Sequence, residues 1–292
     1  MEIPNVIERD SPVKPDTKPS ANPIRRPLVL VTGSKGRLAQ AALPELERHF
    51  DIRATDKAPG SPGEPNYFPA DITQFSQVKP LCQGVEAVVH LAIASLREFG
   101  VPTAPDTEVD PDRVEAFEET TIRVNVDGTR HIFEAARLAG VKKIVYLSSM
   151  TAYQGNKEIP RYERHTPFNP LNLYACTKIF GENLAHVYAR DHGISIIVLR
   201  LGQPYPSGTH LDHVWQSNRR ARSLFVTLED TVQAVLCGLN AKGVDFGIYN
   251  IVSASDNPRV DLSPAREIGY IPRACFSETG LSNREDMPPL SA

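Results

Sequence analysis

The sequence predicts an α/β protein built around a doubly wound parallel sheet, and three observations support this fold class. Short apolar runs typical of strands alternate with helical segments from Leu28 onward. The strand candidates are almost continuously apolar, as a sheet covered by helices on both faces requires. The first candidate runs directly into a glycine-rich turn and a helix at Gly33–Ala39. Such sheets bind ligands at the carboxyl ends of their strands, so this turn also marks the expected site.

The remaining strands and helices follow the same rhythm. The expected strands are Leu28–Thr32, Ile52–Thr55, Ala87–Leu91, Ile144–Leu147, Ser195–Leu199 and Ile248–Ile251. The expected helices are Leu38–His49, Val114–Ala139, Tyr174–His192 and Glu229–Leu239. Pro44 lies inside the first helix and is expected to kink or shorten it. Phe180, Leu184 and Val187 repeat at helical spacing in the third helix and are expected to face the core.

The chain divides into a main domain, a small cap and a polar segment at each end. The expected parts are a flexible proline-rich tail (1–26), the main α/β domain (27–200), a small cap interleaved with the last strand and helices (201–280) and a second tail (281–292). The first tail has no apolar stretch, so it is not a secretory signal. Arg97–Pro111 and Gly202–Arg222 follow strand ends and could cover a substrate, although the first could equally be a tolerated insertion.

Composition and charge narrow the functional classes. The 292 residues are 41% hydrophobic with a net charge of −3, which argues against disorder and against nucleic acid or a membrane surface as main partner. No apolar run approaches the roughly 18 residues of a membrane span. The four cysteines lack the spacing of a zinc site or a disulfide framework. No metal is therefore expected, and a reducing cytoplasm is the expected location.

The turn after the first strand has the properties of a phosphate-binding loop. Gly33 allows a sharp turn, Gly36 leaves room for a pyrophosphate, and Ala39 permits close packing of the helix. The helix N-terminus would then face the phosphates. The spacing G-x-x-G-x-x-A departs from the general dinucleotide fingerprint, so its place after the first strand carries the prediction. Other cofactor contacts expected from this turn are Lys35, Arg37 and Leu38.

Asp56 favours NAD over NADP as the cofactor. It ends the second expected strand, where a carboxylate accepts hydrogen bonds from the ribose hydroxyls and repels a 2′-phosphate. Lys35 and Arg37 favour the opposite choice, because basic residues in this turn could hold that phosphate; solvent exposure of both is the simpler interpretation. Asp71 and Ile72 follow the third strand region and are expected to flank the adenine.

Tyr174 and Lys178 are four residues apart in an expected helix and would lie side by side on one face. A free phenol has a pKa of about 10, and an adjacent ammonium favours the phenolate. Lowering that pKa to about 7 requires roughly 4 kcal/mol, which a buried ammonium and a cationic nicotinamide ring could supply. Such a pair is usually a solvated coincidence, so its meaning depends on the residues around it.

In combination, these motifs resemble the extended short-chain dehydrogenase/reductase family, in its NAD-dependent epimerase/dehydratase branch. The matching segments, in family order, are Thr32-Gly33-x-x-Gly36-x-x-Ala39, Asp56, Asp71-Ile72, His90-Leu91-Ala92, Asn125-Val126-Asp127-Gly128-Thr129, Leu147-Ser148-Ser149-x-x-x-Tyr153 and Tyr174-x-x-x-Lys178. The ordered set is far more specific than any single motif, and it spans most of the chain. The resemblance implies a Rossmann fold in which residues 27–200 bind NAD and a small C-terminal cap binds the substrate.

The resemblance also implies roles for individual residues. Ser149 would hold the reacting substrate oxygen, and Tyr174 would act as general base in oxidation and general acid in reduction. Lys178 would bind the nicotinamide ribose and lower the pKa of Tyr174. Asn125 is expected to be structural, and the register favours Ser149 over Ser148 as the catalytic serine. The residues expected to line the cofactor at the end of the Ala87–Leu91 strand are His90, Leu91 and Ala92.

The catalytic segment and the cap narrow the reaction. Dehydratases of this branch carry two acids after a threonine, whereas this chain has Ser149-Met150-Thr151, so elimination chemistry is not expected. Gly202–Arg222 is short for a lobe that grips a nucleotide sugar. The compact length resembles the uronate dehydrogenases, which act on free sugar acids and imply Ser95 and Arg220 as further substrate contacts beside Ser149. Met150-Thr151 replaces the Asn-His of that subgroup, so the match is partial.

An arginine suits this role because its planar fork can donate two parallel hydrogen bonds to a carboxylate. The alternative is that Arg219, Arg220 and Arg222 form an ordinary solvated basic cluster.

The sequence therefore predicts an NAD-dependent oxidoreductase that transfers hydride at a hydroxyl of a sugar or sugar derivative, with a sugar-acid dehydrogenase as the specific hypothesis. A nucleotide-sugar epimerase, similar to UDP-glucose 4-epimerase, is the alternative. A non-catalytic dinucleotide-binding regulator is disfavoured because Ser149, Tyr174 and Lys178 are all present. The family also implies a homodimer formed through Val114–Ala139 and Tyr174–His192.

Overall fold

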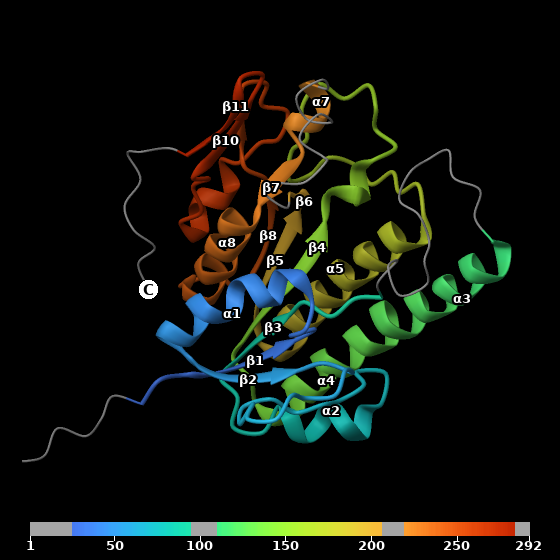
Figure 1. The fold of residues 1–292 in the computed structure, drawn as a ribbon, viewed down its shortest axis with the longest axis vertical. Coiled ribbons are helices and arrows are strands. Elements are labelled where there is room, and N and C mark those ends of the chain that lie inside the picture. Colours follow the sequence, from blue (N-terminus) through green and yellow to red (C-terminus); the bar gives the residue numbers. More distant parts are fainter. Residues whose placement is uncertain (1–24, 95–109, 206–218, 284–292) are drawn as a thin grey trace, which may run out of the picture.

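A parallel sheet of six strands forms the centre of the protein in the computed structural model, which describes residues 25–94, 110–205 and 219–283 (Figure 1). The strands are β1 (Leu28–Thr32), β2 (Asp51–Thr55), β3 (Ala87–His90), β4 (Lys143–Ser149), β5 (Ser195–Leu201) and β8 (Phe246–Ile251), in the order β2-β1-β3-β4-β5-β8. All neighbours pair in parallel. The predicted doubly wound Rossmann fold is confirmed, and the strand order reverses between β1 and β3.

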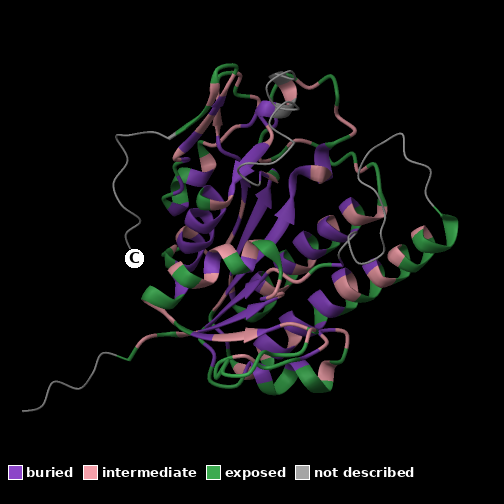
Figure 2. Cartoon of the chain, in the orientation of Figure 1, coloured by how far each residue is buried: buried purple, intermediate pink, exposed green. Residues whose placement is uncertain are grey.

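Helices cover both faces of this sheet, because successive strand residues point to opposite sides. One face packs against α1 (Arg37–His49) and α8 (Leu228–Asn240), and the other packs against α2 (Phe75–Leu81), α4 (Thr129–Ala139) and α5 (Leu173–His192). Val145 and Ile197 belong to the first core, whereas their neighbours Ile144 and Ile196 belong to the second. Buried residues accordingly follow the strands β1, β3, β4 and β5, whereas the edge strand β2 is only partly buried (Figure 2).

The helix expected over Val114–Ala139 is a continuous run of three helical segments. It begins as α3 (Pro111–Thr121), passes through the π-helical turn η2 (Ile122–Gly128) and continues as α4. A π turn inside a long helix often marks a functional region. Here it contains the buried Asn125, whose contacts are described with the site.

Pro44 lies inside α1 and does not shorten the helix, which continues to His49. The expectation that Phe180 and Val187 face the core is wrong. Phe180 and Val187 are 36% and 39% exposed rather than buried, although Leu184 does pack against the core. The reason is that α5 faces the sheet with a different stripe of small residues, among them Ala185 and Ala189.

The cap is a cluster of short elements at the carboxyl ends of β4, β5 and β8 (Figure 1). Its described parts are β6 (Gln203–Tyr205), α7 (Arg219–Arg222), β7 (Phe225–Thr227), β9 (Ala254–Ser255), β10 (Ala274–Ser277) and β11 (Gly280–Asn283), with the 3₁₀ turns η3 (Met150–Tyr153) and η4 (Pro264–Ile268). Strands β6 and β7 pair in parallel, and β9, β10 and β11 form a second small sheet. Strand β11 extends into residues 281–283, which were expected to belong to the second tail.

Several expectations fall outside the described residues. These are the N-terminal tail up to residue 24, the loop 95–109, the loop 206–218 and the last residues 284–292. Within the described part, none of the helices combines the length and the apolar character needed to cross a membrane.

Candidate cofactor and catalytic site

The glycine-rich turn sits at the point where the strand order reverses. Gly33 has a φ of +67°, and a Cβ placed on it would lie 2.7 Å from the backbone of Ala92. Only glycine fits, because the turn touches the end of β3 directly. The backbone N–H groups of Leu91 and Ala92 both donate to Thr32 Oγ1 at 3.3 Å. The structure therefore brings together the predicted residues at the ends of β1 and β3.

This turn has the donors that a pyrophosphate needs. Helix α1 begins after Gly36, and no side chain caps it. The backbone N–H groups of its first turn can therefore donate to a ligand. The Ser34 hydroxyl is buried and has no hydrogen-bond partner among the described residues. Because a helix N-terminus also carries a partial positive charge, the residues present fit the phosphates of a dinucleotide. Leu38 packs against the core beside them.

Asp56 lies beside the turn, as predicted. Its Oδ2 accepts a hydrogen bond from the backbone N–H of Lys35 at 3.0 Å. Lys35 is not simply solvated: its Nζ pairs with Glu64 at 2.7 Å and lies 4.4 Å from the centre of the Tyr67 ring. This pairing neutralises the cation that could have held a 2′-phosphate, which strengthens the prediction of NAD. Arg37 is exposed and donates to the carbonyl of Pro204.

Asp71 and Ile72 make contacts within the protein. Their expected position beside the adenine of the cofactor stays a prediction. Asp71 accepts from the Thr73 N–H at 2.9 Å, which stabilises a tight turn. The Ile72 carbonyl lies 2.9 Å from His131 Nδ1, and its side chain occupies the space opposite Gly128.

His90 lies beneath the cofactor turn rather than on its surface. The ring hydrogen-bonds with the hydroxyls of Thr32 and Thr129, at 2.7 and 3.1 Å, and is 1% exposed. Burial, together with the positive charge of Lys178, lowers the pKa of His90 to about 3. It is a neutral core residue, so the expectation that it lines the cofactor is wrong.

The end of β4 and the start of α5 bring the three predicted catalytic residues together. Asn172 caps α5 by accepting from the Ala175 N–H at 2.9 Å, which fixes the beginning of the helix. The Ser149 hydroxyl hydrogen-bonds with the side chain of Tyr174. Lys178 is 3% exposed, donates to the carbonyl of Leu147 at 2.8 Å and lies 5.8 Å from the centre of the Tyr174 ring.

The expected lowering of the tyrosine pKa is not found in the structure without cofactor. Loss of hydration raises the pKa of Tyr174 to about 12, opposed only by the hydrogen bond from Ser149. Burial likewise lowers the pKa of Lys178 to about 7. The spacing of Tyr174 and Lys178 predicted that the two side chains lie together, but it did not show how deeply they are buried. Burial disfavours both the phenolate and the ammonium.

Ser148 and Asn125 have the structural roles expected for them. Ser148 Oγ donates to Glu182 at 2.5 Å, on the opposite side of β4 from Ser149. Asn125 accepts from the Ala94 N–H at 2.9 Å and donates to Thr177 Oγ1 at 3.0 Å. It thus ties the end of β3 to the helix that carries Tyr174 and Lys178.

A pocket of about 300 Å³ lies next to Ser149, the predicted catalytic serine, and Met150 forms part of its wall. It is lined by Met150, Gln154, Lys157, Tyr162, Arg220 and Leu224. Arg220 donates to the Lys157 carbonyl at 2.6 Å and to the Tyr162 hydroxyl at 2.9 Å, so the wall of the pocket holds its guanidinium in place. The predicted contact Ser95 lies outside the described residues.

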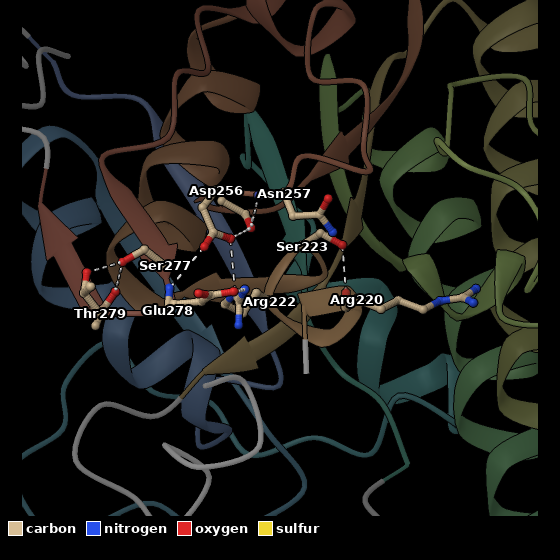
Figure 3. Close-up of polar contacts among 10 residues, drawn as sticks. Arg220, Arg222, Ser223, Asp256, Asn257, Ser277, Glu278 and Thr279 are labelled. Atoms are coloured by element: carbon tan, nitrogen blue, oxygen red, sulfur yellow. Dashed lines mark hydrogen bonds and ion pairs between the residues drawn. The ribbon is translucent and has the colours of Figure 1, made fainter. Parts of the chain in front are cut away.

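The short helix α7 is held by a second arginine that points away from the pocket (Figure 3). Arg222 is 1% exposed and donates to Asp256 and to Glu278, each at 3.1 Å. Its positive charge also helps to lower the pKa of Asp256, against the effect of burial. Arg220 and Arg222 are therefore not an ordinary solvated basic cluster.

Several residues of the site were not predicted from the sequence. Glu182 and Arg200 form a buried ion pair below Lys178, and Tyr162 supports Arg220. Glu182 had a signal, because it continues the four-residue spacing of Tyr174 and Lys178 along α5. Arg200 also had a signal in the sequence, since it is a charged residue that interrupts the apolar run of β5.

The fold and the site define a dinucleotide-binding oxidoreductase with a Ser-Tyr-Lys centre. Residues 29–251 match the model of the NAD dependent epimerase/dehydratase family. The chain belongs to this family, which confirms the predicted family, the class of enzyme and NAD as the cofactor.

Relatives of known activity agree with this assignment. A uronate dehydrogenase of Pseudomonas putida is 29% identical over 90% of each chain. An NAD-dependent glucose-6-phosphate dehydrogenase of Haloferax volcanii is 29% identical over 84% of this chain and 92% of its own. A variant of uronate dehydrogenase from Agrobacterium tumefaciens, solved in complex with NAD, superimposes with a TM-score of 0.69 at 25% identity, over 87% of this chain and 86% of its own.

Replacing Asp56 by serine is expected to relax the preference for NAD. The change removes the carboxylate that repels a 2′-phosphate and that accepts from the Lys35 N–H. We expect the ratio of the NADP and NAD dissociation constants to fall by about tenfold or more, a change of roughly 1.4 kcal/mol. Fluorescence titration with NADH and NADPH measures both constants, and an unchanged ratio would contradict the role of Asp56.

Replacing Arg222 by methionine is expected to weaken the cap. Its buried guanidinium fixes α7 to the small sheet, so its loss should lower the free energy of unfolding by about 1–3 kcal/mol. The KM for substrate should rise more than kcat falls, because Arg220 is carried on the same short helix. Arg161→Met is the control, since Arg161 pairs with Asp261 at a 56% exposed position. If both variants behave alike in denaturation and kinetics, Arg222 does not have this role.

Proposed function

We propose that the protein is an NAD-dependent dehydrogenase that oxidises a hydroxyl of a free sugar acid. The hydrogen bond between Ser149 and Tyr174, with Lys178 buried below it, is the observation that carries this proposal. Its support from relatives is the uronate dehydrogenase activity named for the Pseudomonas putida protein.

In the proposed reaction Ser149 and Tyr174 act on the substrate hydroxyl, and Lys178 acts on Tyr174. The Ser149 hydroxyl donates a hydrogen bond to the reacting oxygen and holds it within reach of Tyr174. The Tyr174 phenolate takes the proton of the substrate hydroxyl as the C–O bond becomes a carbonyl. Bound NAD would supply the hydride acceptor. The positive charge of Lys178 stabilises the Tyr174 phenolate.

The pocket favours a small anionic substrate. Its described lining includes the cations Lys157 and Arg220 and no acidic residue. A guanidinium pairs well with a carboxylate through two parallel hydrogen bonds. A volume of about 300 Å³ is at the lower end of small-molecule sites, which suits one sugar ring better than a nucleotide sugar. These observations support a sugar acid over the epimerase alternative.

An assay for NADH distinguishes the possible reactions. The protein is incubated with NAD and, separately, with uronic acids, glucose 6-phosphate, neutral aldoses and nucleotide sugars. We expect NADH to accumulate with one or more uronic acids, at a rate that exceeds the rate with the neutral aldoses. Isomerised nucleotide sugar without accumulation of NADH would instead establish an epimerase and overturn the proposal.

Replacing Tyr174 by phenylalanine is expected to abolish turnover. The variant loses the proton acceptor, so kcat should fall by about 10²–10⁴-fold, while NAD affinity should stay nearly unchanged. Tyr188→Phe removes the same atom from the same helix, at a hydroxyl that donates to Glu134, and serves as the matched control. Comparable kcat values for the two variants would show that Tyr174 is not the base.

We also propose a cytoplasmic homodimer that forms through α3 and α5. The support is an apolar surface made by Ile122, Phe180 and Val187, which are 41%, 36% and 39% exposed. Helix α5 packs directly against α3 and η2, so these residues share one side of the molecule. The cytoplasmic location is supported by the four cysteines, all of which are free thiols.

Replacing Phe180 by lysine is expected to convert the dimer to a monomer, because a charge would be buried at the centre of the apolar surface. Leu138→Lys is the control, since Leu138 is 47% exposed on α4 outside this surface. Analytical ultracentrifugation of the wild type and both variants measures the mass. A monomeric wild type, or a Phe180→Lys variant that remains dimeric, would contradict the proposed interface.

A further inference from the structure

A row of buried polar residues crosses three neighbouring strands below the catalytic helix. Ser148 of β4 lies beside Arg200 of β5, and Arg200 lies beside Asn250 of β8. Their exposed fractions are 3%, 3% and 2%. Glu182 of α5 covers the row and is also 3% exposed. Such residues are seldom buried without a specific partner, because the loss of hydration is costly.

The Glu182 carboxylate is fixed through both of its oxygens. Arg200 donates from Nε to Oε1 at 2.8 Å and from Nη2 to Oε2 at 2.6 Å, in the bidentate geometry. Ser148 adds a third bond to Oε1 at 2.5 Å. A buried ion pair of this kind contributes little net stability compared with apolar residues of the same size. Its presence below the site therefore points to a purpose other than stability.

Arg200 is itself held from the side of the substrate pocket. Its Nη1 donates to the Tyr153 hydroxyl and, at 2.9 Å, to the carbonyl of Arg164. Tyr153 stacks on Tyr162 with ring centres 5.7 Å apart, and Tyr162 accepts from Arg220. Arg200, which holds the Glu182 carboxylate, is thus linked through Tyr153 and Tyr162 to the substrate pocket.

Among the described residues, Glu182 is the acidic group that acts on Lys178. Glu182 lies one turn further along α5, on the same face of the helix. In the part of the chain that the structure describes, the other ionisable groups beside Lys178 are Tyr174 of α5, Tyr146 of β4 and His90 of β3. Arg200 of β5 contacts Glu182. On η2, which also packs against α5, Arg123 and Asp127 are exposed to solvent. Burial lowers the pKa of Lys178, and the Glu182 charge raises it.

We propose that Glu182, locked in place by Arg200 and Ser148, is a positioning residue that keeps Lys178 in its charged form during the reaction. The inference rests on the proposed function, in which the Lys178 ammonium stabilises the Tyr174 phenolate. The carboxylate does not touch substrate or cofactor. It acts by favouring the proton on the lysine. Burial raises the pKa of the Glu182 carboxyl to about 8, and the hydrogen bond from Ser148 and the charge of Lys178 oppose that rise. The two hydrogen bonds from the Arg200 guanidinium also favour the ionised carboxylate.

The pH dependence of kcat/KM in the Glu182→Gln variant tests this role. Glutamine keeps the shape but removes the negative charge, so Lys178 should lose its proton at a lower pH. We expect the alkaline limb of the profile to move down by about one pH unit relative to the wild type. Asp230→Asn is the matched control: Asp230 is a buried carboxylate bonded to Ser253 and to the N–H groups of Arg273 and Ala274. Its loss should cost stability without moving that limb.

A direct titration of the lysine gives a second readout that needs no turnover. The ε-carbons of lysine are labelled with ¹³C, the Lys178 resonance is assigned by its loss in Lys178→Arg, and its pKa is followed by NMR. We expect that pKa to fall in Glu182→Gln and to stay unchanged in Asp230→Asn. Should Glu182→Gln fail to fold, Ser148→Ala replaces it, with a smaller fall expected because one hydrogen bond to the carboxylate is lost.

The possible results are distinguishable. An unchanged Lys178 resonance and alkaline limb in a folded variant would overturn the role of Glu182 while leaving the dehydrogenase intact. A wild type that turns over none of the sugars would overturn the proposed function, and the NMR titration would still decide whether Glu182 sets the charge of Lys178.

Discussion

The close approach of α5 to the carboxyl ends of β4 and β5 is the constraint on which the site depends. The helix turns a stripe of small residues toward the sheet, and a Cβ on Gly181 would lie 2.1 Å from the Tyr146 hydroxyl. A larger residue there would have to displace either the helix or the buried Tyr146 ring. Because the helix lies so close, the Lys178 side chain is buried and its ammonium reaches the carbonyl of Leu147. The chemistry of the site therefore follows from how the backbone packs.

That burial has an electrostatic cost which the rest of the site offsets. Burial raises the pKa of Tyr174 to about 12 and lowers the pKa of Lys178 to about 7, the reverse of what a phenolate–ammonium pair requires. The neighbours that favour the charged forms are few: Ser149 for the tyrosine and Glu182 for the lysine. A cationic nicotinamide ring would add a further favourable charge for the phenolate. The nicotinamide ring would thus offset part of the cost of burying the phenolate.

The sequence was sufficient wherever a local pattern determines the structure. The glycine turn, the succession of strands and helices along the chain, and the contact between Tyr174 and Lys178 all depend on near neighbours in the sequence. The structure reproduces them. The pairing of Glu182 with Arg200 could not be predicted, because it depends on which strand lies under α5 and in what register. The exposure of Phe180 was missed for a related reason. Two apolar stripes run along α5, and only packing decides which one faces the sheet.

The fate of the hydrogen on the reacting carbon is the most direct test of the central claim. A uronic acid deuterated at its carbon-bound positions is incubated with NAD and the protein, and the reduced cofactor is analysed by mass spectrometry. The account predicts one deuterium transferred to each NADH formed, with none exchanged into water. Loss of deuterium to solvent, or a changed sugar without any deuterated NADH, would contradict hydride transfer from the sugar to a free cofactor.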